Sequence, residues 1–211
     1  KIFWNDARLA KAKEIGMTPV EVAILASIVE EETAAVDEYP IVAGLYINRL
    51  QRGIPLQADP TVKFAVGDFS LQRILFEHLE IDSPYNTYKH AGLPPGPLRI
   101  PTIRGLDAVL NHMKHNYLYM CAKEDFSGRH NFAVTLAEHN RNRYDYFLVQ
   151  EWMAPFADMN ISVCVKNWTA CIHRKCQSTF CKNKIQFSEN CVIASKFFDV
   201  FCRDRKSTRL N

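Results

Sequence analysis

The sequence predicts an α+β fold dominated by helices, with one small β-hairpin and one long proline-rich loop. Apolar residues recur at helical spacing in segments that carry their own start and stop signals. Strand composition is confined to two short segments on either side of residue 125. Five of the ten prolines fall within residues 82–101. The hydrophobic content of 47% over 211 residues allows a sizeable core.

The first two predicted helices form a helical hairpin. Asn5 can cap a short amphipathic helix over residues 6–15. The second helix begins at Thr18, where the threonine hydroxyl, the following proline and Glu21 make a capping box. This second helix is strongly apolar and ends in the acidic run of residues 30–32.

Glu30 stands at the end of a line of small side chains on this second helix. Ala23, Ala26 and Ser27 precede it at three- and four-residue spacing, so a bulky group can lie over the helix beside the carboxyl group. Apolar neighbours there would favour the protonated carboxyl group. The alternative is a solvated acidic helix end, which is the usual place of a run of charges.

The remaining elements follow in order. Further helices are predicted over residues 40–52, 60–66, 70–79 and 102–113, and a last helix after its cap Thr135. In the helix over residues 70–79, four side chains are expected to face inward: Leu71, Ile74, Leu75 and Leu79. Residues 117–122 and 130–133 are predicted to pair as a hairpin.

Residues 82–101 are expected to form a long ordered loop that folds back over the helix of Glu30. The segment has no apolar periodicity, which a linker would also lack. Tyr85, Asn86 and Tyr88 lie near its prolines, and such side chains make a stiff, hydrogen-bonding wall that suits sugars.

Charge and cysteine content change near residue 150. Residues 1–150 hold 16 Lys and Arg against 18 Asp and Glu and one of the seven cysteines, so nothing in them indicates nucleic-acid binding. Residues 153–211 have no sustained period, and their last eight residues resemble a translated sequencing adapter. We expect a domain over residues 1–152 and a non-native tail, out of frame or adapter-derived, over residues 153–211.

Two groups of possible metal ligands are weak. His112 and His115 lie three apart on a predicted helix without further ligands at regular spacing. The tail carries four candidates in a spacing that matches no standard zinc motif: Cys171, His173, Cys176 and Cys181. A small disulfide or zinc module remains the alternative for the tail. We predict no metal and no cofactor, since glycine-rich phosphate loops and nucleophile elbows are also missing from the sequence.

Six ordered motifs resemble the YceG-like, or MltG, endolytic murein transglycosylases. They are LASIVEEET (25–33), VAGLYINRL (42–50), LQADPTV (56–62), DSPYNTY (82–88), GLPPGP (92–97) and YLY (117–119). The resemblance covers about residues 1–150 and is greatest for the variants of Bacteroidetes-type bacteria. It implies a lysozyme-like catalytic domain. Because the chain begins at Lys1 in mid-pattern, we expect a fragment of a longer protein.

The resemblance also implies an activity. Such an enzyme is a lyase that cuts peptidoglycan between N-acetylmuramic acid (MurNAc) and N-acetylglucosamine (GlcNAc) inside a strand and leaves a 1,6-anhydro-MurNAc end. The family motif makes Glu30 the general acid and base, with Glu32 in support. One glutamate can suffice because the nucleophile is a hydroxyl of the substrate, whereas a hydrolase of this class commonly needs two carboxylates.

Five residues are expected along the sugar sites: Gln57, Asp59, Tyr85, Asn86 and Tyr88. Each has an alternative role as a helix cap or loop brace. The implied partners are peptidoglycan strands and, as neighbours, the wall-elongation synthases. The implied place is the outer side of the inner (cytoplasmic) membrane, reached through an N-terminal helix that the soluble fragment lacks.

Two other function classes stay open at this point. The domain could be a glycan-binding module that has lost turnover, or a protein-interaction domain whose proline-rich loop contacts a partner. Analysis of the ends of digested glycan strands separates the lyase from a hydrolase and from a binding module.

Overall fold

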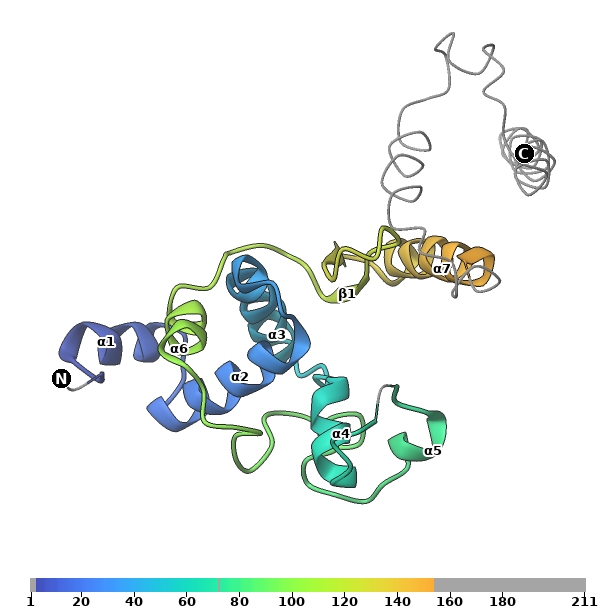
Figure 1. Ribbon diagram of the computed structural model, residues 1–211. Helices are drawn as coiled ribbons and strands as arrows, with labels where there is room; N and C mark the ends of the chain where they lie inside the picture. Colours follow the sequence, from blue (N-terminus) through green and yellow to red (C-terminus); the bar gives the residue numbers. More distant parts are fainter. Residues whose placement is uncertain (1–2, 72, 154–211) are drawn as a thin grey trace, which may run out of the picture. The chain divides into compact units, whose positions relative to one another are not determined.

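The computed structural model describes residues 3–71 and 73–153 (Figure 1). In chain order, the elements are α1 (Asp6–Glu14), α2 (Pro19–Glu32), the 3-10 turn η1 (Val36–Glu38), α3 (Tyr39–Gln51), α4 (Asp59–Val66), α5 (Phe76–Leu79), α6 (Ile103–Leu110), β1 (Tyr119–Ala122), β2 (His130–Ala133) and α7 (Leu136–Met153). The predicted α+β class, rich in helices with one small hairpin, is confirmed. The tail predicted to follow residue 152 lies outside the described residues, apart from Met153.

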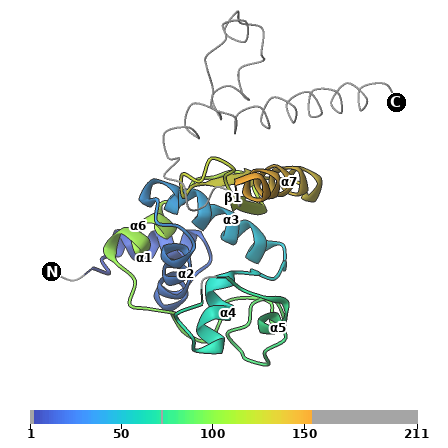
Figure 2. The same ribbon diagram turned by 45° about the vertical axis from the view of Figure 1, so that its right-hand side comes forward.

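The core forms where α2, α3 and α6 pack together, an arrangement that both ribbon views show (Figures 1 and 2). α2 is apolar on nearly all sides, and a helix of that kind must be buried. Its fully buried residues are Val22, Leu25, Ala26, Ser27, Ile28 and Val29. The predicted capping box at Thr18 is present, with the Glu21 N–H donating to the threonine hydroxyl at 3.3 Å.

Gly44 lets the segment after α6 lie directly on α3. A Cβ at this position would stand 2.3 Å from the carbonyl oxygen of Met113 and 2.8 Å from Nε2 of His115. Asn48, one turn further along α3, donates to the carbonyl oxygens of His115 and Tyr117 at 2.8 and 3.1 Å. These hydrogen bonds hold the chain in place directly before the hairpin of β1 and β2.

Two predicted helices are wrong in extent. Of residues 70–79, only Phe76–Leu79 are helical, and Leu75 is exposed instead of facing inward. The Asp68 carboxylate accepts hydrogen bonds from the N–H and the hydroxyl of Ser70 at 2.9 and 2.6 Å, which holds the backbone in a turn.

The helix predicted over residues 102–113 ends at Leu110. The Asn111 side chain donates to the carbonyl oxygen of Asp107 at 2.7 Å and so satisfies one carbonyl group of the last turn. His112 and His115 therefore do not share a helix face, which corrects the premise of that candidate metal pair.

β1 and β2 pair antiparallel, with Tyr119 opposite Ala133 and Ala122 opposite His130. The hairpin is joined to η1 by Glu38, a buried carboxylate that accepts a hydrogen bond from the His130 N–H at 3.0 Å. α7 packs against both strands.

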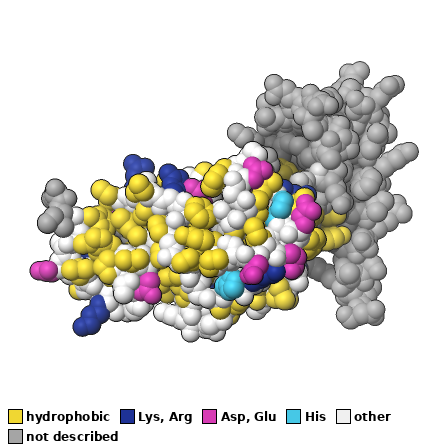
Figure 3. Space-filling model, turned by 90° about the horizontal axis from the view of Figure 1, so that it is seen from below, with side chains coloured by type: hydrophobic (Ala, Val, Ile, Leu, Met, Phe, Trp, Pro, Cys, Tyr) yellow, Lys and Arg dark blue, Asp and Glu magenta, His cyan; other side chains and the backbone are white. Residues whose placement is uncertain are grey.

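The surface in Figure 3 carries hydrophobic side chains among scattered charges of both signs. Large apolar side chains that are exposed include Phe76, Ile100 and Ile103. Within residues 3–71 and 73–153, we find no helix both long and apolar enough to cross a membrane.

Candidate functional site

Glu30 and Glu32 lie at the end of α2 but have different surroundings. An α-helix turns by about 100° per residue, so side chains two positions apart point to nearly opposite sides. The two carboxyl groups of one motif are thereby separated into two environments.

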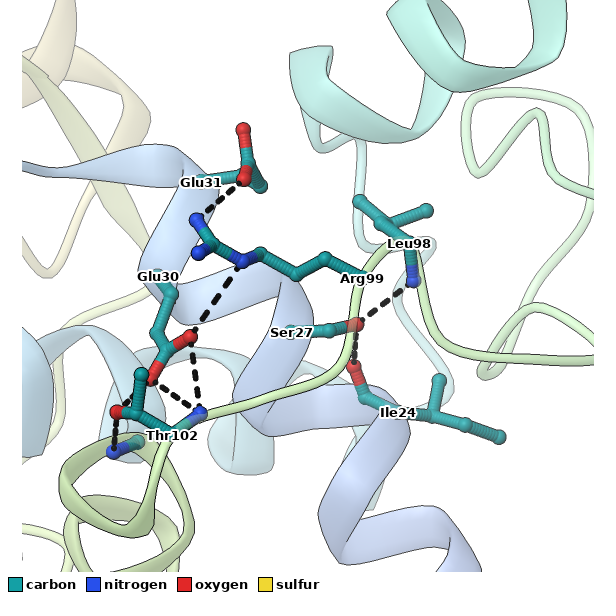
Figure 4. Close-up of polar contacts among 8 residues, drawn as sticks. Ile24, Ser27, Glu30, Glu31, Leu98, Arg99 and Thr102 are labelled. Carbon is teal, nitrogen blue, oxygen red and sulfur yellow. Dashed lines mark hydrogen bonds and ion pairs between the residues drawn. The ribbon is translucent and has the colours of Figure 1, made fainter.

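Glu30 contacts the N-terminus of α6 (Figure 4). Its Oε1 accepts a hydrogen bond from the Thr102 N–H at 3.0 Å and another from the Thr102 hydroxyl. Its Oε2 lies 3.9 Å from Nε of Arg99. The side chain is 3% exposed. A carboxylate is favourable at this end of a helix, where backbone N–H groups are unpaired and the dipole is positive.

The line of small residues on α2 is covered by the end of the proline-rich loop. The Leu98 N–H donates to the hydroxyl oxygen of Ser27 at 2.9 Å, and that hydroxyl donates to the Ile24 carbonyl oxygen at 2.7 Å (Figure 4). The prediction that the loop folds back over this helix is confirmed near the end of the loop, for Leu98 and Arg99. The bulky group that lies beside Glu30 is therefore the proline-rich loop of the same chain. The neighbours of the Glu30 carboxyl group are hydrogen-bond donors and not the apolar side chains that we expected.

Glu32 lines a pocket of about 600 Å³ on another side of α2. Three of the five predicted sugar-site residues line the same pocket: Gln57, Asp59 and Tyr88. The pocket therefore gathers residues from the end of α2, the start of α4 and the proline-rich loop. Its lining in the described structure does not include Glu30.

The carboxyl group of Glu32 has a pKa near neutrality. The residue surface is only partly buried, yet the surrounding protein atoms are dense enough for burial to raise the pKa of Glu32 to about 7. The Tyr46 hydroxyl donates to Oε1 and opposes this rise, while the negative charge of Asp59 adds to it. A group that is half protonated at neutral pH can both give and take a proton.

Asp59 is held by Tyr88. The Tyr88 hydroxyl donates to Oδ1 of Asp59 at 2.6 Å, and burial, this hydrogen bond and the nearby carboxylate charges raise the pKa of Tyr88 well above its usual value. Tyr88 therefore remains a neutral donor. A helix cap was the alternative role for Asp59, but Asp59 is the first residue of α4 and the cap position is Ala58.

The structure places Tyr85 and Asn86 outside the lining of this pocket. Asn86 is fully buried and donates to the carbonyl oxygens of Leu79 and Ile81, both at 2.9 Å. The Tyr85 ring packs 4.6 Å from the ring of Phe64. These contacts fit the loop-brace alternative, and a sugar-binding role for either residue stays a prediction.

Two further residues, Tyr46 and Arg49, line the pocket from α3 and were not among the predicted site residues. Arg49 donates to the carbonyl oxygens of Pro55 and Leu118 at 2.9 and 2.7 Å and to Gln57 Oε1 at 2.6 Å. Arg49 thus connects three segments of the chain that form the wall of the pocket. Both residues fall within the VAGLYINRL motif, and this membership was the sequence signal that could have indicated them.

The hairpin and α7 close the far side of the pocket, which was also missed. The residues there are mostly aromatic or basic and include Tyr119, His130, His139, Arg143 and Tyr146. The rings of Tyr119 and His139 stack with centroids 5.4 Å apart. Within the described ranges, no group of three His, Cys, Asp or Glu side chains is arranged to hold a metal ion.

Comparison with known proteins gives consistent matches. The model of the YceG-like family matches residues 2–145. An endolytic murein transglycosylase of Bacillus subtilis is 43% identical over 122 residues, which cover 58% of this chain and 33% of that protein. The protein of the same name from Streptococcus pneumoniae D39 is 34% identical over 134 residues, covering 62% and 24% of the two chains.

A crystal structure of a YceG-like protein from Listeria monocytogenes aligns with a TM-score of 0.56 at 38% identity. The alignment covers 64% of this chain and 45% of that one. The chain spans about a third or less of the length of the curated relatives it matches. The expectation of a Bacteroidetes-type variant stays a prediction.

Proposed function

The chain belongs to the YceG-like family, and from this we propose that it cuts the glycan strands of peptidoglycan as an endolytic transglycosylase. The bond is that between MurNAc and GlcNAc inside a strand, and the product carries a 1,6-anhydro-MurNAc end. Two relatives named endolytic murein transglycosylase, 43% and 34% identical in the matched region, support the reaction class.

We assign the general acid and base to Glu32 in place of Glu30. The observation that carries this assignment is that Glu32 lines the pocket and has a pKa of about 7. Glu30 is instead enclosed by Thr102 and Arg99. Both residues belong to the motif, so Glu30 remains the competing candidate that mutation must exclude.

The reaction needs one carboxyl group that acts twice. Protonated Glu32 donates its proton to the glycosidic oxygen as the bond from that oxygen to C1 of MurNAc breaks. The C6 hydroxyl oxygen of the same sugar then bonds to C1, and its proton returns to the Glu32 carboxylate. Glu32 ends the cycle protonated, water is not consumed, and the acetamido group of MurNAc can assist as a neighbouring nucleophile.

A hydrolase is the second candidate, and Asp59 is the observation that favours it. Asp59 supplies a second carboxylate in the pocket of Glu32 and is oriented by Tyr88. Hydrolases of glycosidic bonds commonly use two carboxyl groups, the second as a nucleophile or as a base for water. In that case the products would have reducing ends.

Peptidoglycan as a substrate implies a place of action. We propose that the domain works on the outer side of the cytoplasmic membrane and close to the wall-elongation synthases that make the strands.

Mass spectrometry of digested peptidoglycan tests the proposed reaction. Purified peptidoglycan is incubated with the full chain, or with its Glu32→Gln variant as the control for contaminating enzymes. We expect anhydro-MurNAc ends from the unaltered chain alone. Reducing ends would support the hydrolase, and bound but uncut strands would support a glycan-binding module.

A further inference from the structure

We infer that Tyr46 is a positioning residue whose buried hydroxyl holds the Glu32 carboxyl group in place and favours its charged form. The inference rests on the proposed function of Glu32, because the proton balance of that group matters only if it is the acid. It adds to the site a residue from α3, a helix that carries none of the predicted site residues.

The geometry joins two helices through one hydrogen bond. Tyr46 lies in the middle of α3 and is 2% exposed, and Glu32 is the last residue of α2. The Tyr46 hydroxyl donates to Oε1 of Glu32, and in the described part of the chain this is its one recorded hydrogen-bond partner. A buried phenol needs a partner for its hydroxyl, so the ring packing of Tyr46 and the position of Glu32 depend on each other.

The direction of this hydrogen bond is fixed when Glu32 is charged. Burial and the neighbouring charge of Glu32 raise the pKa of Tyr46 well above its usual value, so the phenol keeps its proton and acts as a donor. A charged carboxylate only accepts hydrogen bonds, and a donor therefore favours the charged form over the protonated one. Tyr46 thus counteracts burial, which favours the protonated form of Glu32.

The other titratable or charged groups of the pocket come from several elements. They are Arg49 on α3, Asp59 on α4, Tyr88 in the proline-rich loop, Tyr119 and Cys121 on β1, His130 on β2, and His139, Arg143 and Tyr146 on α7. The change of Tyr46 to Phe removes one oxygen atom and leaves all nine in place. Any change in the titration of Glu32 can then be assigned to the missing hydroxyl.

Carbon-13 NMR of the full chain tests the inference without any need for activity. With carboxyl-labelled glutamate, we expect the titration midpoint of Glu32 to rise by about one pH unit in Tyr46→Phe, as loss of one hydrogen bond to a charged group would cause. Tyr39→Phe is the matched control, since Tyr39 lies on the same helix but makes no recorded hydrogen bond to Glu32. An unchanged or lowered midpoint in Tyr46→Phe would overturn the inference.

A second measurement uses the unaltered chain and covers the case in which Tyr46→Phe fails to fold. The Cζ resonance of Tyr46 should shift with the same midpoint as the Glu32 carboxyl carbon, because the hydroxyl donates to it. A Cζ resonance that stays flat through that range would also refute the inference. If the NMR results hold but peptidoglycan is not cut, the proposed function fails while the contact of Tyr46 with Glu32 stands.

Discussion

Glu30 and Glu32 show how two positions on one helix assign different roles to the same side chain. Glu30 points to the N-terminus of α6, where Thr102 donates a hydrogen bond to its carboxylate and Arg99 is its ion-pair partner. Glu32 points to a pocket in which burial raises its pKa to about 7. The sequence motif brings both to the end of α2, but the direction of each depends on the helix phase and on which segments pack nearby.

The pH dependence of the reaction follows from the pKa of Glu32. A general acid must be protonated in the free enzyme, so kcat/KM should fall as pH rises through about 7. The rate of anhydro-muropeptide release, measured from pH 5 to pH 9 at constant ionic strength, checks this. A rate that keeps rising up to pH 9 would exclude Glu32 as the acid.

The raised pKa of Glu32 also affects the stability of the folded protein. The pKa of Glu32 is raised in the folded protein, so its contribution to stability is fully present below about pH 4.5 and is lost as pH rises through about 7. The variant Glu32→Gln lacks this loss. As pH rises over this range, we therefore expect its unfolding temperature to increase relative to that of the unaltered chain. Thermal unfolding of both proteins at pH 4.5 and pH 8 measures the gain, and a constant difference between them would contradict it.

At the scale of elements, the fit between α2 and α6 depends on Gly105. A Cβ there would lie 2.3 Å from Oε1 and 2.8 Å from Cδ of Glu30. Gly105→Ala should therefore lower the free energy of unfolding by about 1–3 kcal/mol, as overpacking commonly does. Denaturant titration measures the loss.

A double-mutant cycle provides the control for Gly105→Ala. When Glu30→Ala has already removed the carboxylate, the added methyl group has room, and Gly105→Ala should cost much less. Equal costs in both backgrounds would show that the clash with Glu30 is not the cause.

Elements with local start signals could be predicted from the sequence. Asn5 and Thr18 cap α1 and α2 as expected, and Thr135 accepts a hydrogen bond from the Glu138 N–H at the start of α7. The helix predicted over residues 70–79 was wrong because the turn at Asp68 overrides its apolar spacing. Local chemistry determines helix ends well when a cap is present and poorly when two local patterns compete.

The candidate site was less predictable than the fold for a physical reason. Asp59 and Tyr88 come from segments 29 residues apart and meet through one hydrogen bond. Glu32 and Tyr46 come from different helices. Such pairs depend on tertiary packing, so the motif could supply the candidates but could not assign the acid to Glu30 or to Glu32.

At the scale of the whole molecule, residues 1–152 are expected to be sufficient for folding and activity. The family match ends at residue 145, whereas the predicted tail begins at residue 153 and lies outside the described residues beyond Met153. Deletion of residues 153–211 should leave the unfolding temperature and peptidoglycan cleavage unchanged and should preserve or improve solubility. A deletion variant that unfolds, or stoichiometric zinc bound through the tail cysteines, would show that the tail is a real module.

The most direct test of Glu32 as the acid compares Glu32→Gln with Glu30→Gln, two isosteric changes in the same motif. The measured quantity is the release of anhydro-muropeptides from purified peptidoglycan at pH 6, with unfolding temperatures as the check on folding. We expect Glu32→Gln to lose at least about a hundredfold in rate while it stays folded, and Glu30→Gln to keep most of the rate. Near-normal release by Glu32→Gln, or loss of release by a folded Glu30→Gln, would contradict the assignment.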